Sequence, residues 1–140
     1  MRKEKFIVLM KTLLVCSVAL ALSGCVTKID SEHKLSDLEY TVVPDVDVPE
    51  ELKPEIEQKQ KEEFYLTYAD QGYLYLARGY GAQPTSGYSI SVSELYETKN
   101  AICFQTSLMG PKQGEETKEV ETYPYIVVKM EYMDKEVVFE

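Results

Sequence analysis

Tryptophan, histidine and cysteine are scarce in this chain. Its 140 residues include no tryptophan, one histidine and three cysteines. His33 lies in a polar stretch without strand or helix periodicity, so we do not expect it to serve as a base for the Cys103 thiol. No Gly-x-Ser-x-Gly, P-loop, dinucleotide-binding or zinc-ligand spacing occurs in the sequence. The sequence therefore favours a non-enzymatic protein with no cofactor and no bound metal.

Long apolar runs are also absent, apart from one near the N-terminus. Four basic residues precede an apolar run over residues 13–22, which ends at Ser23-Gly24-Cys25. This run is shorter than the ~20 residues that span a bilayer, and the whole pattern is typical of a secretory signal peptide. An uncleaved helix or an ordinary signal peptide cut nearby are the alternatives.

The residues at the end of this run resemble the lipobox of bacterial lipoproteins. Leu22-Ser23-Gly24-Cys25 carries the resemblance, which implies a thioether-linked diacylglyceryl group on Cys25 and cleavage after Gly24. Residues 1–24 would then be the signal peptide. Two acyl chains are enough for stable anchoring, so we expect the mature chain on the extracytoplasmic face of a cell membrane. Whether this is an inner or an outer membrane stays open.

Positive charge is in short supply. The chain has 15 basic and 24 acidic residues, a net charge of −9. Residues 1–24 hold four of the basic residues and one of the acidic ones, so the mature part keeps 11 against 23, a net charge of −12. Such a surface repels phosphate backbones, which argues against nucleic-acid binding. With Cys16 removed and Cys25 lipidated, Cys103 has no partner for an intramolecular disulfide.

The mature chain divides into a polar segment and a domain. Residues 25–48 lack helical or strand periodicity, and we expect a flexible tether there. Residues 49–61 predict a short helix, starting near Pro54, with Leu52 and Ile56 as its apolar side. The domain is expected to cover residues 49–140.

From Phe64 onward the hydrophobic pattern has a period of two. Strand candidates are bounded by turn-rich connections containing glycine, proline, asparagine or aspartate. The fold class predicted is mainly β, a small antiparallel sheet or sandwich of about five to seven strands with a short N-terminal helix. The clearest candidates are residues 73–80, 88–93, 101–108, 125–132 and 137–139.

A glycine-rich segment separates two of these candidates. Residues 79–90 read Gly-Tyr-Gly-Ala-Gln-Pro-Thr-Ser-Gly-Tyr-Ser-Ile. Glycine and proline at this density indicate a turn with positive φ or a close backbone approach. From the residues alone, the segment is interpreted as a constrained hairpin connection.

The same segment resembles the signature of the PrcB C-terminal domain family, the protease-complex-subunit domain. The usual form of that signature is a Gly-x-x-Pro-Thr-Gly-Gly-Tyr-Ser-Ile-like stretch, and Ser86 stands where it more often has glycine. Met109-Gly110-Pro111 and residues 123–129 agree with the family as well, so that the resemblance covers about residues 64–139. It implies a domain carried on exported lipoproteins and, through the family name, a protease as a candidate partner.

A second resemblance implies a different function. Residues 83–88 are similar to a loop of chagasin-type cysteine-protease inhibitors, which also use an Arg-Pro-Trp element that a chain without tryptophan cannot supply. A protease inhibitor using the Pro84–Tyr88 loop, and a purely structural domain, are therefore the alternatives. The leading hypothesis is an accessory or binding subunit for an envelope protein, a protease among the candidates. Its expected contact residues are Tyr80, Pro84, Thr85, Ser86, Gly87, Tyr88 and Tyr125.

Overall fold

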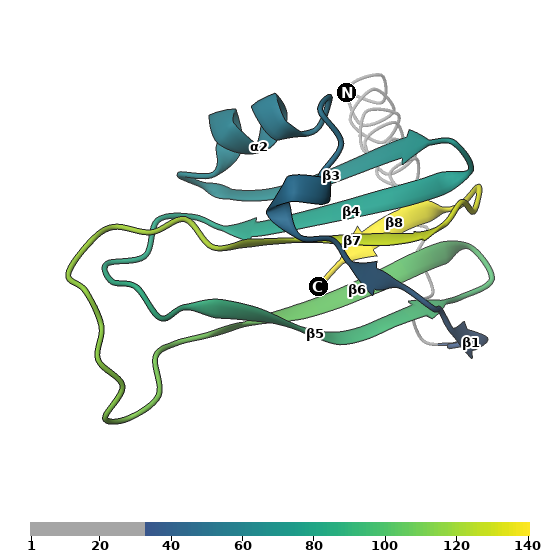
Figure 1. The fold of residues 1–140 in the computed structure, drawn as a ribbon. Coiled ribbons are helices and arrows are strands. Elements are labelled where there is room, and N and C mark those ends of the chain that lie inside the picture. The colour runs from purple at the N-terminus through teal and green to yellow at the C-terminus, as the bar shows by residue number, and fades with distance from the viewer. Residues whose placement is uncertain (1–32) are drawn as a thin grey trace, which may run out of the picture.

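The protein is a two-layer β structure with a short helix on one outer face (Figure 1). The computed structural model describes residues 33–140. The predicted signal peptide and the predicted lipidation of Cys25 fall outside the described residues. The elements are β1 (Ser36–Asp37), β2 (Thr41–Val42), the 3-10 helix η1 (Asp45–Asp47), α2 (Lys53–Lys59), β3 (Glu63–Asp70), β4 (Tyr73–Tyr80), β5 (Ser89–Glu97), β6 (Ala101–Met109), β7 (Tyr125–Glu131) and β8 (Glu136–Phe139).

The strands form two four-stranded sheets. One sheet has the order β1-β5-β6-β8, here called sheet A, and the other has the order β2-β7-β4-β3, called sheet B. All pairs are antiparallel except β6 with β8, which is parallel. The prediction of a mainly β sandwich with a short helix is confirmed. One pair departs from the antiparallel pattern: β8 is parallel to β6, because the turn after β7 carries the chain across to sheet A.

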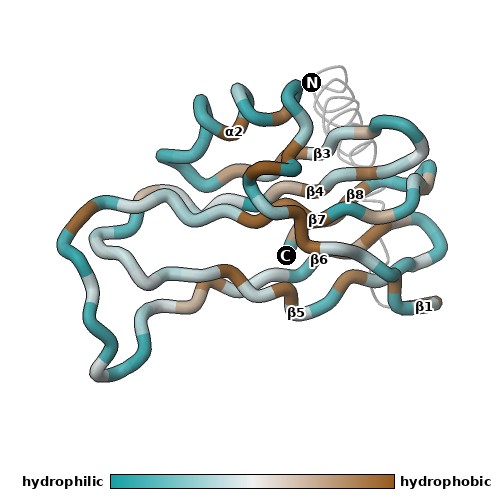
Figure 2. Tube along the Cα trace, in the orientation of Figure 1, coloured by the Kyte–Doolittle hydropathy of each residue, from teal (hydrophilic) through white to brown (hydrophobic). Residues whose placement is uncertain are grey.

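The main core lies between the two sheets and follows the period-two pattern. Leu74 and Leu76 of β4 and Val128 of β7 point from sheet B toward Ile102 and Phe104 of β6. These side chains are at most 6% exposed. Burial of one such side chain stabilises the fold by ~1.5–3 kcal/mol. The hydropathy of the trace shows the same alternation, with apolar residues gathered between the layers and under α2 (Figure 2).

A second apolar cluster lies under α2, on the outer face of sheet B. Leu52 and Ile56 are buried there against Phe64 of β3 and Val127 of β7. Pro54 falls in the first turn of the helix, where its missing N–H costs no hydrogen bond. Gly79 lies opposite Phe64 in the β3–β4 register, and a Cβ at Gly79 would overlap the Phe64 ring. The predicted short helix is therefore present and packs on the sheet.

The expected tether is wrong for its described part, residues 33–48. Ser36 and Asp37 pair with β5, and Thr41 and Val42 pair with β7, so that the segment adds an edge strand to each sheet. Val48 is 4% exposed in the cluster under α2. Each strand is only two residues long, too short for periodicity to reveal, and these two strands raise the total to eight.

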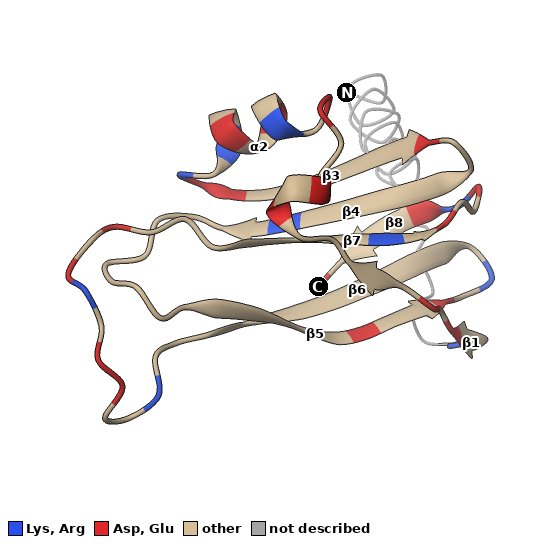
Figure 3. Cartoon of the chain, viewed as in Figure 1, with Lys and Arg blue, Asp and Glu red and all other residues tan. Residues whose placement is uncertain are grey.

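No helix within residues 33–140 is long and apolar enough to cross a membrane. Acidic and basic residues lie on α2, on the turns and along the connection between β6 and β7 (Figure 3).

Candidate interaction site

Two long loops project together from one end of the sandwich (Figure 1). Residues 81–88 connect β4 to β5, and residues 110–124 connect β6 to β7. We call these two loops together the arm. The first loop was interpreted as a hairpin connection, and that was wrong: β4 belongs to sheet B and β5 to sheet A, so the loop crosses between layers.

Backbone hydrogen bonds join the two loops along their length. Gln83 and Thr122 exchange two bonds, with N···O distances of 2.8 and 3.0 Å. The Ser86 N–H donates to the Lys118 carbonyl at 3.0 Å, and the Lys118 N–H donates to the Ser86 hydroxyl at 2.8 Å. The Thr122 hydroxyl donates to the Thr85 carbonyl at 2.7 Å. The arm is therefore a hydrogen-bonded unit rather than two independent loops.

Two glycines shape the first loop. Gly81 has φ +76°, and a Cβ there would lie 3.3 Å from backbone atoms of residues 61–63. Gly87 has φ +91°, and its Cβ would lie 3.1 Å from Pro111. Both conformations favour glycine. Ser86 is not at positive φ, so the loop conformation does not need the glycine that the family pattern more often has there.

The outer side of the arm exposes both apolar and charged residues. Pro84 is exposed, and Val120, which lies between Lys118 and Thr122, is 54% exposed. Thr85 and Tyr88 are half-buried. Charged residues of both signs alternate along the second loop (Figure 3); they are Lys112, Glu115, Glu116, Lys118, Glu119 and Glu121.

Tyr80 belongs to the interior between the sheets rather than to the arm surface. Its hydroxyl lies 2.7 Å from the Thr106 hydroxyl of β6, which links the two layers. Its ring lies 4.1 Å from the guanidinium carbon of Arg78, and the Tyr65 ring lies 4.3 Å from the same atom. Arg78 is 5% exposed and pairs with Glu63, which lowers the pKa of that carboxyl group. Tyr80 thus helps to hold a buried cation.

Tyr125 lies on the opposite face of sheet B. It stands opposite Gly79 in the β4–β7 register, one position away from Tyr80, and packs against the cluster under α2. Its hydroxyl donates to Asp45 at 2.9 Å. Burial and this hydrogen bond raise the pKa of Tyr125 to about 12. The structure therefore places Pro84, Thr85, Ser86, Gly87 and Tyr88 together on the arm, with Tyr80 and Tyr125 apart from them.

The second loop was not foreseen as part of the site. Its bonds to residues 83–86 span more than thirty positions, and its sequence shows only the polar and glycine-containing pattern of an ordinary connection. Met109-Gly110-Pro111 was the one signal, since Pro111 is the residue that Gly87 approaches.

Within the described part of the chain, the cysteine lies in the interior. Cys103 is fully buried and faces Tyr96 across the β5–β6 pair. A hydrogen bond with Cys103 and burial raise the pKa of Tyr96. Within residues 33–140, no group of three or more His, Cys, Asp or Glu side chains could hold a metal ion.

The fold and the arm define a small β-sandwich domain with a braced pair of loops at one end. The model of the PrcB C-terminal family matches residues 74–131, from β4 to the end of β7 with both loops of the arm. The match supports the resemblance to this family over that part of the chain. Comparison with curated proteins and with solved structures finds no match to either.

Proposed function

We propose that the chain is a non-enzymatic, membrane-anchored lipoprotein whose β domain binds an envelope protein through the arm. The braced arm carries this proposal. A pair of loops that is locked before binding loses little conformational entropy when a partner docks on it. The family match covers both loops, and the family name supports a protease complex as the partner.

The position of the arm suits a surface-anchored protein. Leu35 is near the start of the described chain and lies at the end of the sandwich away from the arm (Figure 1). Its N–H donates to the Glu97 carbonyl there. Nine residues separate a lipidated Cys25 from Leu35, and the ten steps between them span at most ~36 Å. Such a short connection would hold the β1 end near the bilayer and direct the arm away from it.

This proposal predicts that Cys25→Ala releases the protein from the membrane fraction or stalls its processing; unchanged membrane retention would contradict the anchor.

Site-specific photocrosslinking in the native envelope tests the arm as a contact surface. A photoreactive amino acid at Pro84 or Val120 should give a crosslinked adduct with one partner, identified by mass spectrometry. The same amino acid at Ser93, an exposed residue on β5, is the matched control and should give none. Equal crosslinking from all three positions, or none from the arm, would count against the proposal.

For the protease-inhibitor alternative, the pairing of the two loops sets a steric requirement on the protease cleft. The Pro84–Tyr88 loop is bonded to residues 118–122 along one side, so a protease cleft would have to admit both loops. Purified protein that slows a papain-like protease at submicromolar concentration would favour this alternative. Digestion as an ordinary substrate would exclude it.

A further inference from the structure

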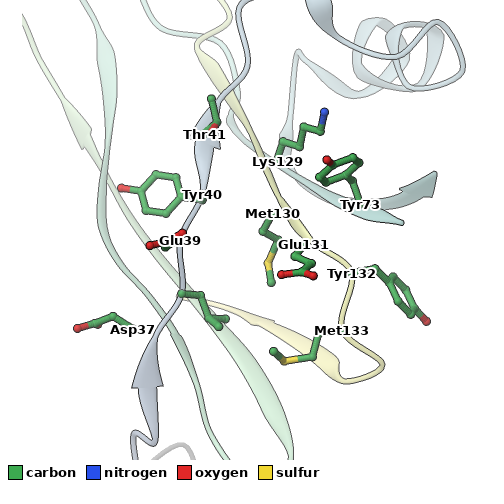
Figure 4. Close-up of a pocket in the computed structure, with 11 residues that line it drawn as sticks. Asp37, Glu39, Tyr40, Thr41, Tyr73, Lys129, Met130, Glu131, Tyr132 and Met133 are labelled. Atoms are coloured by element: carbon green, nitrogen blue, oxygen red, sulfur yellow. The ribbon is translucent and has the colours of Figure 1, made fainter. Parts of the chain in front are cut away.

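A groove lies at the opposite end of the sandwich from the arm, beside the edge of sheet B. It has a volume of about 980 Å³ and is lined by residues 37–41, by Tyr73 and by residues 129–133. Figure 4 shows Tyr73 and Lys129 together on one margin, Tyr40 on the segment across from them, and Glu131 between.

The path of the chain between the sheets creates this groove. β1 lies on the edge of sheet A and β2 on the edge of sheet B, so residues 38–40 cross from one sheet to the other. β2 pairs with β7 only at Val128 and Lys129, whereas β7 continues to Glu131. The outer edge of β7 is therefore left without a neighbouring strand at Met130 and Glu131, and such an edge can accept an extended peptide.

The side chains around this edge are aromatic and acidic. Tyr40, Tyr73 and Tyr132 are between 39% and 50% exposed. Asp37, Glu39 and Glu131 are also exposed. The cation in the lining, Lys129, lies 3.9 Å from the centroid of the Tyr73 ring and is half-buried. Asp37 pairs with Lys34, so Glu39 and Glu131 are the carboxylates left for a ligand, together with the exposed tyrosine rings.

Elsewhere in the same domain, tyrosine rings and a carboxylate bind a buried arginine side chain. Arg78 lies between the Tyr65 and Tyr80 rings and pairs with Glu63. Tyrosine rings attract a guanidinium group through their negative faces, and a carboxylate adds a charge-assisted hydrogen bond. The groove exposes the same chemical groups, and Lys129 already lies against one of its rings, that of Tyr73.

We propose that this groove binds an extended segment of a partner protein that carries arginine or lysine. The segment would lie along the free edge of β7, with its cationic side chains against the tyrosine rings and against Glu39 and Glu131. The net charge of −9 for the whole chain would draw such a segment toward the protein. This inference does not rest on the arm, and it gives the protein a second binding surface at the other end of the domain.

Isothermal titration of the full chain in neutral detergent, at 50 mM NaCl, tests the proposal with a defined probe. The probe is the capped peptide Ac-Val-Arg-Val-Arg-Val-NH2. Its counterparts carry citrulline or glutamate in place of arginine. The arginine peptide should bind, and the other two should bind at least about fivefold more weakly, because the citrulline side chain keeps the shape of arginine without its charge. Equal binding of the arginine and citrulline peptides, or no binding of the arginine peptide, would overturn the proposal.

Matched variants locate the binding site on the protein. Glu39→Gln with Glu131→Gln should weaken the arginine peptide by about fivefold or more. Glu116→Gln with Glu119→Gln removes the same charge from the arm and should leave the affinity within about twofold. Equal losses in both pairs would show a general charge effect and contradict the groove. Sedimentation that shows a dimer dissolved by the Glu39 and Glu131 changes would assign the groove to a second copy of this chain, which would also overturn the proposal.

Discussion

The bracing of the arm by side-chain hydroxyl groups can be measured directly. Ser86→Ala with Thr122→Val removes one hydrogen bond from the Lys118 N–H and one to the Thr85 carbonyl. The arm is half-exposed, so water can replace each lost partner, and each bond is worth about 0.5–1 kcal/mol net. The two changes together should favour arm opening by about 1–2 kcal/mol, a factor of about 5 to 30 in the opening equilibrium.

Hydrogen exchange followed residue by residue is the assay. The amides of Gln83 and Ser86 should exchange about 5 to 30 times faster in the double variant. The amides of Leu76 and Val128, in the core strands of sheet B, should change by less than about threefold, because the arm lies outside the core and its opening does not need global unfolding.

A matched control separates bracing of the arm from loss of hydroxyl groups in general. Ser93 and Ser107 share a hydrogen bond of 3.2 Å on the exposed face of sheet A. Ser93→Ala with Ser107→Ala should leave exchange in the arm unchanged. If the arm amides exchange at the wild-type rate in the first variant, or if core and arm amides accelerate equally, the two hydroxyl groups do not brace the arm.

Three further perturbations test the fold around the site. Ile56→Ala should lower the free energy of unfolding by about 2–4 kcal/mol in chemical denaturation, because the side chain is 3% exposed under α2; the exposed Glu55→Ala should cost less than about 1 kcal/mol. The Arg78 guanidinium lowers the pKa of Glu63, so the stability from this pair is present above the unfolded pKa, near 4.5, and is lost as pH falls through the folded pKa. Glu63→Gln should therefore destabilise the protein at pH 7 and approach wild type in acid; a difference independent of pH would contradict the pairing. Tyr125→Phe should remove the absorbance change near pH 12 from a spectrophotometric titration of the folded protein, and a loss near pH 10 instead would contradict the raised pKa of the Tyr125 hydroxyl.

Most strands could be predicted because their side chains alternate over six or more residues. In β7 the apolar residues Ile126, Val128 and Met130 at every second position mark the face that meets the other sheet, whereas β4 and β6 each have four consecutive buried residues, so their patterns indicate a strand but not its inward face. β1 and β2 have two residues each, and they exist only because β5 and β7 offer an edge for pairing. Such pairing depends on tertiary structure, so the local sequence could not reveal it.

The candidate site could be predicted in part for a similar reason. The glycines, Pro84 and Tyr88 mark the first loop by composition, since Gly81 and Gly87 require φ values that other residues rarely adopt. The role of the second loop depends on hydrogen bonds between segments far apart in the chain, which no local pattern encodes. Tyr80 directly precedes the first loop and Tyr125 directly follows the second, but strand alternation sends them to opposite faces of sheet B.

The central claim is that the arm is a contact surface, and affinity purification from the native envelope tests it most directly. Pro84→Asp with Val120→Asp places two charges on exposed positions of the arm. Ser93→Asp with Ser107→Asp places the same charges on sheet A. We predict that the arm variant loses its co-purified partner while its melting temperature stays within about 3 °C of that of wild type. The sheet A variant should retain the partner. Retention of the partner by the arm variant would contradict the account.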